Sequence, residues 1–134
     1  MIKQLAHVCL HSEDLEATRR FYCTGLGMEK GFDFQRSEEH FGYYLKAGSR
    51  SFIEVFKGSP KAVGNIDHLA LEVSDIHALA DHLRKQGIPV SDPQLGADNS
   101  WQAWLEDPSG VKIELHEYTL ESSQLTGLTC VLQD

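Results

Sequence analysis

The hydrophobic and polar positions along the chain predict one order of elements, and they predict it twice. Apolar and polar residues alternate over 2–10, as in a half-buried strand, and apolar side chains then recur at helical spacing over 15–25. Three further alternating stretches follow at 27–35, 41–47 and 51–57, with a turn at 37–40. The first part of the chain is therefore predicted to fold as β-α-β-β-β.

The second part of the chain has the same pattern, after a linker at 57–65 that contains glycine and proline. A strand is predicted over 66–73, and Asp75 begins a helix that extends to about Gln86. Further strands are predicted at 88–95, 101–107 and 111–118, of which the first contains two prolines and is expected to lie at an edge or to fray. The tail, 119–134, has no clear pattern, so a short helix, a swapped arm and disorder are all open.

Polar residues within these strands repeat at a nearly constant interval. His68 follows His7 by 61 residues, and Glu114 follows Glu54 by 60 residues. A repeat that keeps polar strand residues in register indicates one unit present twice, with a pseudo-twofold site. We therefore expect an α+β protein, a single domain built from module one at about 1–58 and module two at about 65–118.

Charge and composition narrow the class of protein. The chain has 134 residues, 41% of them hydrophobic, and a formal net charge of −8, which fits one globular domain and argues against nucleic-acid binding. No apolar run approaches the ~20 residues that span a membrane, and the N-terminus lacks the long apolar segment of a signal peptide. Three scattered cysteines favour reduced thiols. These features predict a cytoplasmic protein that binds neither nucleic acid nor a membrane.

Four polar residues lie in the middle of predicted strands, each beside aliphatic neighbours. They are His7, Glu54, His68 and Glu114. A glutamate buried alone in a sheet is costly, so it must be paired, solvated or bound to a metal. Two imidazoles and two carboxylates suit a divalent cation such as Ni²⁺ or Zn²⁺, with Co²⁺, Mn²⁺ and Fe²⁺ as alternatives, and the absence of thiolate ligands argues against a structural zinc. A single strand histidine is usually an ordinary core or surface residue, but the shared spacing of all four favours a metal site.

Several stretches resemble the vicinal oxygen chelate superfamily, which includes glyoxalase I, methylmalonyl-CoA epimerase, extradiol dioxygenases and bleomycin resistance proteins. The stretches are LAHVCLHSEDLEATRRFYCTGLGME, FIEVF, IDHLALEVSDI and WLEDPSGVKIELHEY, of which EDPSGVKIEL is the most specific. The resemblance covers about residues 2–118. It implies that paired βαβββ modules form a cupped, mixed open sheet around a metal, and that the protein is a homodimer.

The four polar residues match the metal ligands of glyoxalase I, which come from the first and last strands of each module. The resemblance implies His7, Glu54, His68 and Glu114 as ligands, and a lactoylglutathione-lyase-like reaction in which the metal chelates two vicinal oxygens of the substrate. Glu114 is the implied catalytic base that shuttles a proton, although the near symmetry of the ligands leaves Glu54 open. The alternatives are an extradiol-type dioxygenase, which the extra carboxylate of Glu54 argues against, and a small-molecule binding protein of the drug-resistance kind, which the retained ligands argue against.

The positions that help to hold glutathione in glyoxalase I carry other residues here. His11 stands where an arginine is usual, and Gly58 stands where an asparagine is usual, so the use of glutathione or another thiol is left open. Strand parity places further candidates on the ligand face, with Cys9 and His116 beside the ligands. The candidate substrate-binding residues are His11, Phe52, Phe56 and Trp104. The competing interpretations are a core role for the two phenylalanines, an exposed strand end for His11, and a subunit contact for Trp104.

Overall fold

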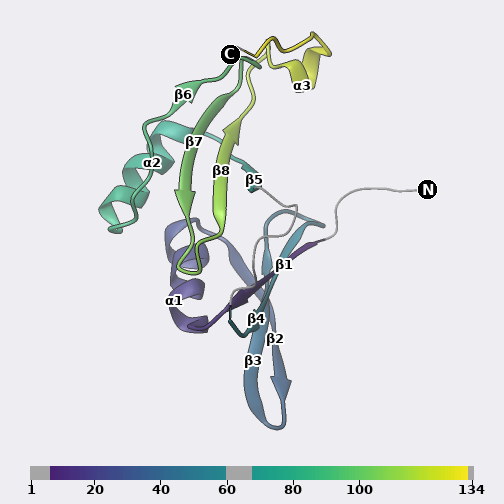
Figure 1. Ribbon diagram of the computed structural model, residues 1–134, viewed down its shortest axis with the longest axis vertical. Coiled ribbons are helices and arrows are strands. Elements are labelled where there is room, and N and C mark those ends of the chain that lie inside the picture. The colour runs from purple at the N-terminus through teal and green to yellow at the C-terminus, as the bar shows by residue number, and fades with distance from the viewer. Residues whose placement is uncertain (1–6, 60–67, 133–134) are drawn as a thin grey trace, which may run out of the picture. The chain divides into compact units, whose positions relative to one another are not determined.

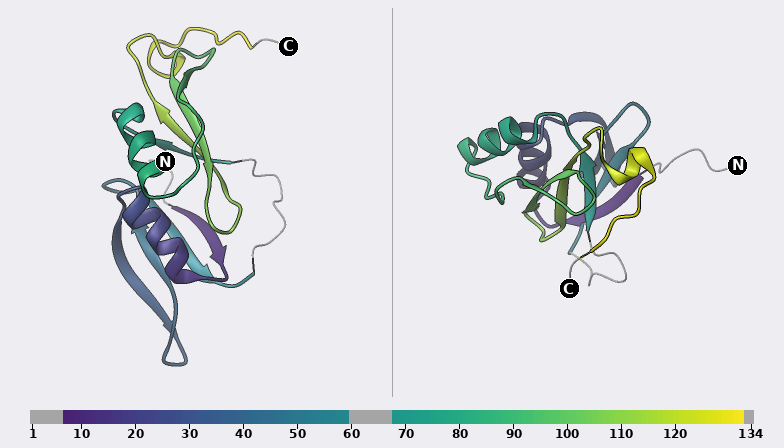
Figure 2. Two further views of the ribbon diagram at one scale, coloured as in Figure 1. Left: turned by 90° about the vertical axis from the view of Figure 1, so that its left-hand side faces the viewer. Right: turned by 90° about the horizontal axis from the view of Figure 1, so that it is seen from above.

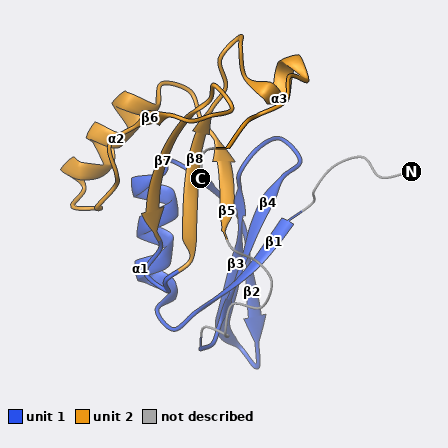
Figure 3. Ribbon diagram, turned by 45° about the horizontal axis from the view of Figure 1, so that its top comes forward, with its two compact units in different colours: residues 1–65, 107–110 blue, residues 66–106, 111–134 orange. Residues whose placement is uncertain are grey.

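The computed structural model describes residues 7–59 and 68–132. The chain forms two compact units, one of residues 1–65 with 107–110 and one of residues 66–106 with 111–134 (Figure 3). Each unit contains one four-stranded sheet, and the element order β-α-β-β-β occurs in both (Figure 1). The predicted α+β class with two βαβββ modules is confirmed.

The sheet of the first unit has the strand order β1-β4-β3-β2. Its strands are β1 (His7–Ser12), β2 (Glu29–Arg36), β3 (Glu39–Lys46) and β4 (Phe52–Lys57). β1 runs parallel to β4, whereas β4, β3 and β2 are antiparallel neighbours. A parallel pair needs a long crossover connection, which here contains a helix and the β2–β3 hairpin. The first and last strands of the module are therefore direct neighbours.

A helical segment follows β1 and covers one face of this sheet (Figure 2). It consists of α1 (Leu15–Arg19) and a π-helical continuation, η1 (Arg20–Gly25). The carboxylate of Asp14 accepts a hydrogen bond from the amide of Ala17 at 2.9 Å and so caps the first turn of the helix. An acidic residue directly before an apolar helical pattern is a typical start of a helix.

Buried side chains show which face of the first sheet the helix covers. Tyr43 donates a hydrogen bond to the carbonyl of Leu15 in α1, with a distance of 2.7 Å. Alternate residues of β3 and β4 are at most 1% exposed on this side, namely Tyr43, Leu45, Ile53 and Val55. Residues of the other parity point to the opposite face. That opposite face carries His7 and Glu54.

The turn between β2 and β3 is shorter than the sequence pattern predicts. Only Ser37 and Glu38 connect the two strands, with φ of 51° and 65°, and β3 already begins at Glu39. Two residues with positive φ form the kind of turn whose twist matches that of two antiparallel strands. β1 also extends beyond its predicted end, because Ser12 pairs with Lys57 of β4. Ser12 is buried, and its hydroxyl lies 2.8 Å from that of Thr18.

The second unit repeats this sheet in the order β5-β8-β7-β6. Its strands are β5 (Leu69–Glu72), β6 (Gln94–Leu95), β7 (Trp101–Glu106) and β8 (Lys112–Glu117). β5 runs parallel to β8, and the other neighbours are antiparallel. The strand predicted at 88–95 is reduced to the two residues of β6. Pro89 and Pro93 account for this, since neither can donate to a strand ladder.

Helix α2 (Ile76–Lys85) covers one face of the second sheet, in agreement with the predicted helix. Asp75 caps it from a left-handed conformation, with φ of 50°, and accepts a hydrogen bond from the amide of Ala78 at 3.2 Å. The helix and sheet bury Ile76, Ala80, Leu83, Ala103, Leu105, Ile113 and Leu115. Glu114 and Trp104 have the other parity and lie on the face away from this core.

The C-terminal segment leaves β8 and forms a short helix, α3 (Ser123–Thr126), which was one of the three possibilities open from the sequence. The hydroxyl of Ser100 donates to that of Ser122 at 2.8 Å, and both side chains are fully buried. Within the described residues, no helix is long and apolar enough to cross a membrane. The predicted strand residues 2–6 and the linker residues 60–65 lie outside the described part of the chain.

Candidate metal centre

The first unit brings His7 and Glu54 to one face of its sheet. His7 lies on β1 and Glu54 on β4, and the register of these parallel strands pairs His7 with Phe52 and Cys9 with Glu54. Nε2 of His7 lies 4.0 Å from Oε1 of Glu54, whose side chain is only 16% exposed. An imidazole and a largely buried carboxylate therefore face one another across adjacent strands.

Tyr44 completes this cluster and was not predicted from the sequence. It lies on β3 directly opposite Glu54, and its hydroxyl oxygen lies 2.9 Å from Nδ1 of His7. The two rings meet edge to face, with centroids 5.6 Å apart. Partial desolvation and the negative charge of Glu54 raise the pKa of the Tyr44 hydroxyl. When Nδ1–H of His7 donates to this oxygen, the ring is oriented and Nε2 keeps a lone pair for a ligand.

An aromatic wall adjoins the His7–Glu54 pair. We define it as Phe34, Tyr44, Phe52 and Phe56. Phe52 and Phe56 flank Glu54 on the same face of β4, and the Tyr44 ring lies 5.4 Å from that of Phe52. Phe34 on β2 packs against Phe56 with ring centroids 4.8 Å apart. This half of the candidate site therefore presents aromatic surface beside its imidazole and carboxylate.

Two glycines make room for this arrangement. A Cβ at Gly42 would come within 3.0 Å of the Phe56 ring and 2.1 Å of the carbonyl oxygen of Val55, so the absence of a side chain lets Phe56 lie across β3. His11 is half-buried, lies in register with Phe56 at the far end of β1, and closes the space beside Gly58. A Cβ at Gly58 would lie 3.3 Å from Cδ2 of His11.

The second unit brings His68 and Glu114 closer together. His68 directly precedes β5, and Glu114 lies in the middle of β8. Nε2 of His68 lies 3.2 Å from Oε2 of Glu114, whose side chain is 10% exposed. Trp104 lies opposite Glu114 on β7, and its ring meets that of His68 edge to face at 4.9 Å. The ammonium of Lys112 lies 4.7 Å from the Trp104 ring centroid, a cation–π contact.

The two units thus repeat a cluster of three residues rather than a pair. In each unit a histidine, a glutamate and an aromatic ring meet, and the aromatic residue lies directly opposite the glutamate in the strand register. Trp104 follows Tyr44 by 60 residues, the interval that separates the two glutamates. Extending the repeat to aromatic positions would have identified Tyr44 from the sequence.

His116 and Asp98 extend the cluster of the second unit. Nδ1 of His116 lies 3.1 Å from Oε1 of Glu114, and its buried Nε2 lies 3.4 Å from Oδ2 of Asp98 without forming a hydrogen bond. Strand parity places His116 on the ligand face, but Asp98 lies in the loop between β6 and β7, which carries no periodic signal. Partial burial acts to raise the pKa of Asp98. Hydrogen bonds from Gln124 and the Ser100 amide, with the nearby His116, outweigh it and lower that pKa below its usual value.

The imidazole nitrogens and carboxylate oxygens of the two histidine–glutamate pairs are donor atoms of the kind that bind divalent cations. Within residues 7–59 and 68–132, no group of three histidine, cysteine, aspartate or glutamate side chains is close enough to hold a metal ion by itself. Each unit instead supplies one imidazole nitrogen and one carboxylate oxygen that approach each other. Two ligand atoms at neighbouring octahedral positions of a zinc-sized ion lie about 3 Å apart. The separation of 3.2 Å between His68 and Glu114 fits that arrangement.

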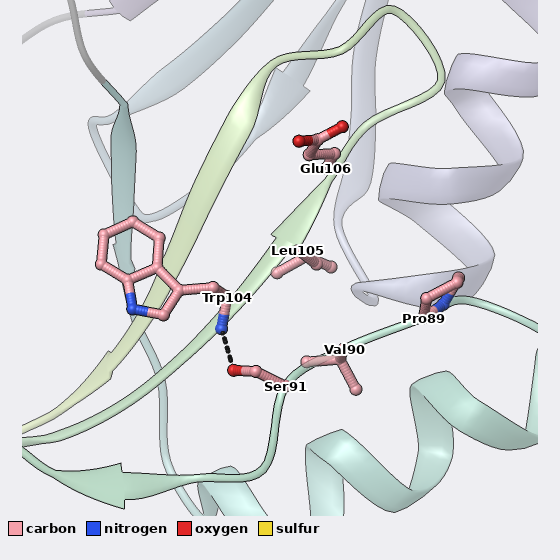
Figure 4. A pocket seen from close by; sticks show the side chains of 6 residues that line it. All are labelled: Pro89, Val90, Ser91, Trp104, Leu105 and Glu106. Atoms are coloured by element: carbon pink, nitrogen blue, oxygen red, sulfur yellow. Dashed lines mark hydrogen bonds between the residues drawn. The ribbon is translucent and has the colours of Figure 1, made fainter.

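A cavity in the second unit lies beside Trp104 but does not include His68 or Glu114 (Figure 4). Its volume is about 420 Å³, and it is lined by Pro89, Val90, Ser91, Trp104, Leu105 and Glu106. The hydroxyl of Ser91 accepts a hydrogen bond from the backbone amide of Trp104 at 2.8 Å, which ties the loop before β6 to β7. Trp104 therefore contacts both the His68 ring and this cavity.

These observations define an α+β protein of two βαβββ modules, each with a histidine–glutamate pair on one face of its sheet. A family model described as the Glyoxalase/Bleomycin resistance protein/Dioxygenase superfamily matches residues 4–115. The chain belongs to this superfamily.

Three similar proteins illustrate the range of that superfamily. A probable lactoylglutathione lyase of Synechocystis sp. is 34% identical over 121 residues, which cover 83% of this chain and 92% of that protein. An ethylmalonyl-CoA/methylmalonyl-CoA epimerase of Cereibacter sphaeroides is 30% identical over 133 residues, with coverage of 87% and 99%. The crystal structure of a glyoxalase family protein from Enterococcus faecalis aligns with a TM-score of 0.70 at 30% identity, over 86% of this chain and 98% of that one.

Proposed function

We propose that the protein is a metal-dependent isomerase or lyase of the glyoxalase type, which acts on a small carbonyl compound or its thiol adduct. The observation that supports this most directly is the repeated approach of an imidazole and a carboxylate, His7 to Glu54 and His68 to Glu114. The histidines lie on or directly before the first strand of each module, and the glutamates lie on the last. The 34% identity to a probable lactoylglutathione lyase points to the same chemistry.

In this proposal the four side chains hold one divalent ion, Ni²⁺ or Zn²⁺ in the first place. When bound, the ion would supply Lewis-acid stabilisation of the negative charge that develops on two neighbouring oxygens of the substrate. His7 and His68 act as neutral donors through Nε2, and Tyr44 keeps the His7 ring in the orientation that this requires.

Glu114 acts as the base that moves the proton. Its carboxylate removes a proton from the carbon next to the substrate carbonyl and returns it to the adjacent carbon, so the reaction is an isomerisation with no net gain or loss of atoms. Its low exposure keeps bulk water away from that proton. Glu54 has the corresponding position in the first unit, but it lacks the close imidazole partners of Glu114.

The aromatic wall favours a substrate with an apolar group. Phe52 and Phe56 present ring surface on either side of Glu54, and an apolar group bound there loses contact with water. No arginine or asparagine stands at the positions that help to hold glutathione in glyoxalase I, where this chain has His11 and Gly58. Small thiols other than glutathione therefore belong among the substrates to be tested.

The test is a turnover assay on protein stripped of metal and then reconstituted with single divalent ions. The substrates are hemithioacetals of methylglyoxal with glutathione and with smaller thiols, and formation of the thioester is measured. We expect turnover only with metal, and a loss of about 10²–10⁴-fold in kcat for Glu114→Gln. Glu39→Gln, an exposed carboxylate at the start of β3, is the matched control and should leave the rate unchanged. Equal rates in Glu114→Gln and the original chain would overturn the assignment of the base.

A second candidate is epimerisation of an acyl-CoA thioester, which the 30% identity to the Cereibacter sphaeroides epimerase favours. The proton transfer next to a carbonyl is the same, but no thioester is formed. Exchange of deuterium from the solvent into methylmalonyl-CoA, followed by mass spectrometry, separates the two activities. Exchange without turnover of any hemithioacetal would replace the first proposal by the second.

A further inference from the structure

A line of polar contacts runs from Glu114 into the C-terminal segment. His116 lies two residues after Glu114 on the same face of β8, and its Nδ1 lies 3.1 Å from Oε1 of Glu114. Because an ionised carboxylate only accepts hydrogen bonds, the imidazole must be the donor. This contact occupies Oε1 and leaves Oε2, which lies 3.2 Å from Nε2 of His68.

The far side of the His116 ring faces a carboxylate that is itself fixed. Oδ2 of Asp98 lies 3.4 Å from Nε2 of His116 and accepts a hydrogen bond from Nε2 of the Gln124 side chain at 2.7 Å. Its Oδ1 accepts a hydrogen bond from the amide of Ser100 at 3.1 Å. Asp98 therefore has little rotational freedom, and the His116 side chain, 14% exposed, lies between two carboxylates.

The internal repeat shows that this arrangement is particular to the second unit. Glu54 corresponds to Glu114, and the residue two positions later is Phe56 in the first unit but His116 in the second. Phe56 packs in the aromatic wall and offers no donor to Glu54. Sheet geometry alone therefore does not require an imidazole at this position.

We propose that His116 is a positioning residue for Glu114: lying between Glu114 and the fixed carboxylate of Asp98, it engages Oε1 so that Glu114 meets a metal ion or substrate through Oε2 alone. The inference rests on the proposed function, since it assigns the orientation of a candidate ligand and base. It also gives the C-terminal segment a part in the site, because Gln124 of α3 donates to Asp98.

Metal affinity of the full chain tests this inference without relying on turnover. Metal-free protein is titrated with Ni²⁺ or Zn²⁺ against a competing chelator. His116→Phe introduces the residue that the first unit carries at this position, and we expect it to weaken affinity about 10–100-fold. His116→Asn should restore most of that loss, because its amide nitrogen stands as many bonds from the backbone as Nδ1 of histidine. Asp98→Asn should weaken affinity by a smaller factor.

The matched control is His40→Phe. His40 also lies on a strand and also contacts a carboxylate, Asp33, at 3.0 Å, but neither belongs to the candidate ligands. We expect its affinity to equal that of the original chain. Equal affinity for His116→Phe, or no recovery in His116→Asn, would overturn the positioning role while leaving the proposed function intact. An original chain that binds neither ion would instead overturn the proposed function. If His116→Phe does not fold, the Asp98→Asn comparison decides, and unchanged affinity there counts against the inference.

Discussion

At the scale of single residues, neighbouring tyrosines on β3 have separate tasks because strand residues alternate between faces. Tyr43 is fully buried and donates to the carbonyl of Leu15 in α1. Tyr44, the next residue, points to the other face and contacts Nδ1 of His7. One hydroxyl therefore serves the packing of the helix on the sheet, whereas the other orients a candidate ligand.

Removal of the Tyr43 hydroxyl should affect stability, whereas removal of the Tyr44 hydroxyl should affect metal binding. Tyr43→Phe removes a hydrogen bond to a partly buried carbonyl and should lower the free energy of unfolding by about 1 kcal/mol, with metal affinity unchanged. Tyr44→Phe should weaken metal affinity about 10-fold, with little change in stability. Urea unfolding and chelator competition on both variants measure the two effects. A Tyr44→Phe variant that loses stability but keeps its affinity would contradict the role given to Tyr44.

At the scale of elements, the sequence predicts most of the fold because its signals are local. Periodicity indicates the helices and long strands, and Asp75 marks the start of the second helix. The two-residue turn at Ser37 and Glu38 is not evident, because neither is the glycine or asparagine usual at positive φ. The extent of β6 is not evident either, since it depends on pairing with β7.

The candidate site likewise contains residues that can be predicted from the sequence and residues that cannot. The two histidines and two glutamates are found because strand parity and the repeat identify them together. Asp98 cannot be found in that way, because it reaches His116 from a loop and through a tertiary contact. Sequence periodicity carries information about faces of regular elements, and none about where a loop side chain points.

Packing of the helix onto the first sheet should make stability sensitive to alkaline pH. Burial, with the negative charge of Asp107, raises the pKa of Tyr22, and burial raises that of Tyr43. Their pKa is about 10 in the unfolded chain. The folded state therefore holds these protons more tightly, so its advantage is complete below pH 10 and is lost as pH rises above that value. Each tyrosine should contribute a slope of about 1.4 kcal/mol per pH unit.

Urea unfolding between pH 9 and pH 11 measures this slope. Tyr22→Phe and Tyr43→Phe should each make the alkaline loss of stability shallower. Tyr118→Phe, at an exposed tyrosine, serves as the control and should leave the slope as it is in the original chain. A slope that does not differ between Tyr43→Phe and the control would show that the Tyr43 proton is not held by folding.

At the scale of the whole molecule, the four proposed ligands are divided equally between the two compact units. His7 and Glu54 belong to the first unit, and His68 and Glu114 belong to the second. Within the described residues, neither unit has three such side chains close enough together to hold an ion by itself. Because each unit carries two of the four proposed ligands, variants of one unit at a time can show whether one unit or both hold the ion.

Metal at about 100 times its dissociation constant should raise the free energy of unfolding by about 2.7 kcal/mol. His7→Ala and His68→Ala should each abolish this increase, and His40→Ala should retain it. Thermal unfolding with and without Ni²⁺ or Zn²⁺ measures the effect. An increase that survives in His7→Ala but not in His68→Ala would assign the ion to the second unit alone.

Phe56 and His116 occupy equivalent positions of the repeat but differ in chemistry, and this difference matters for engineering the chain. The internal repeat gives one position twice, and this position carries aromatic surface in one module and a polar contact in the other. Substitutions at Phe56 and its aromatic neighbours change the surface of the first module's sheet, whereas Glu114 belongs to the other sheet. An engineer can therefore vary the aromatic surface of one sheet without replacing any residue of the sheet that carries Glu114, a separation that a single, unduplicated sheet does not offer.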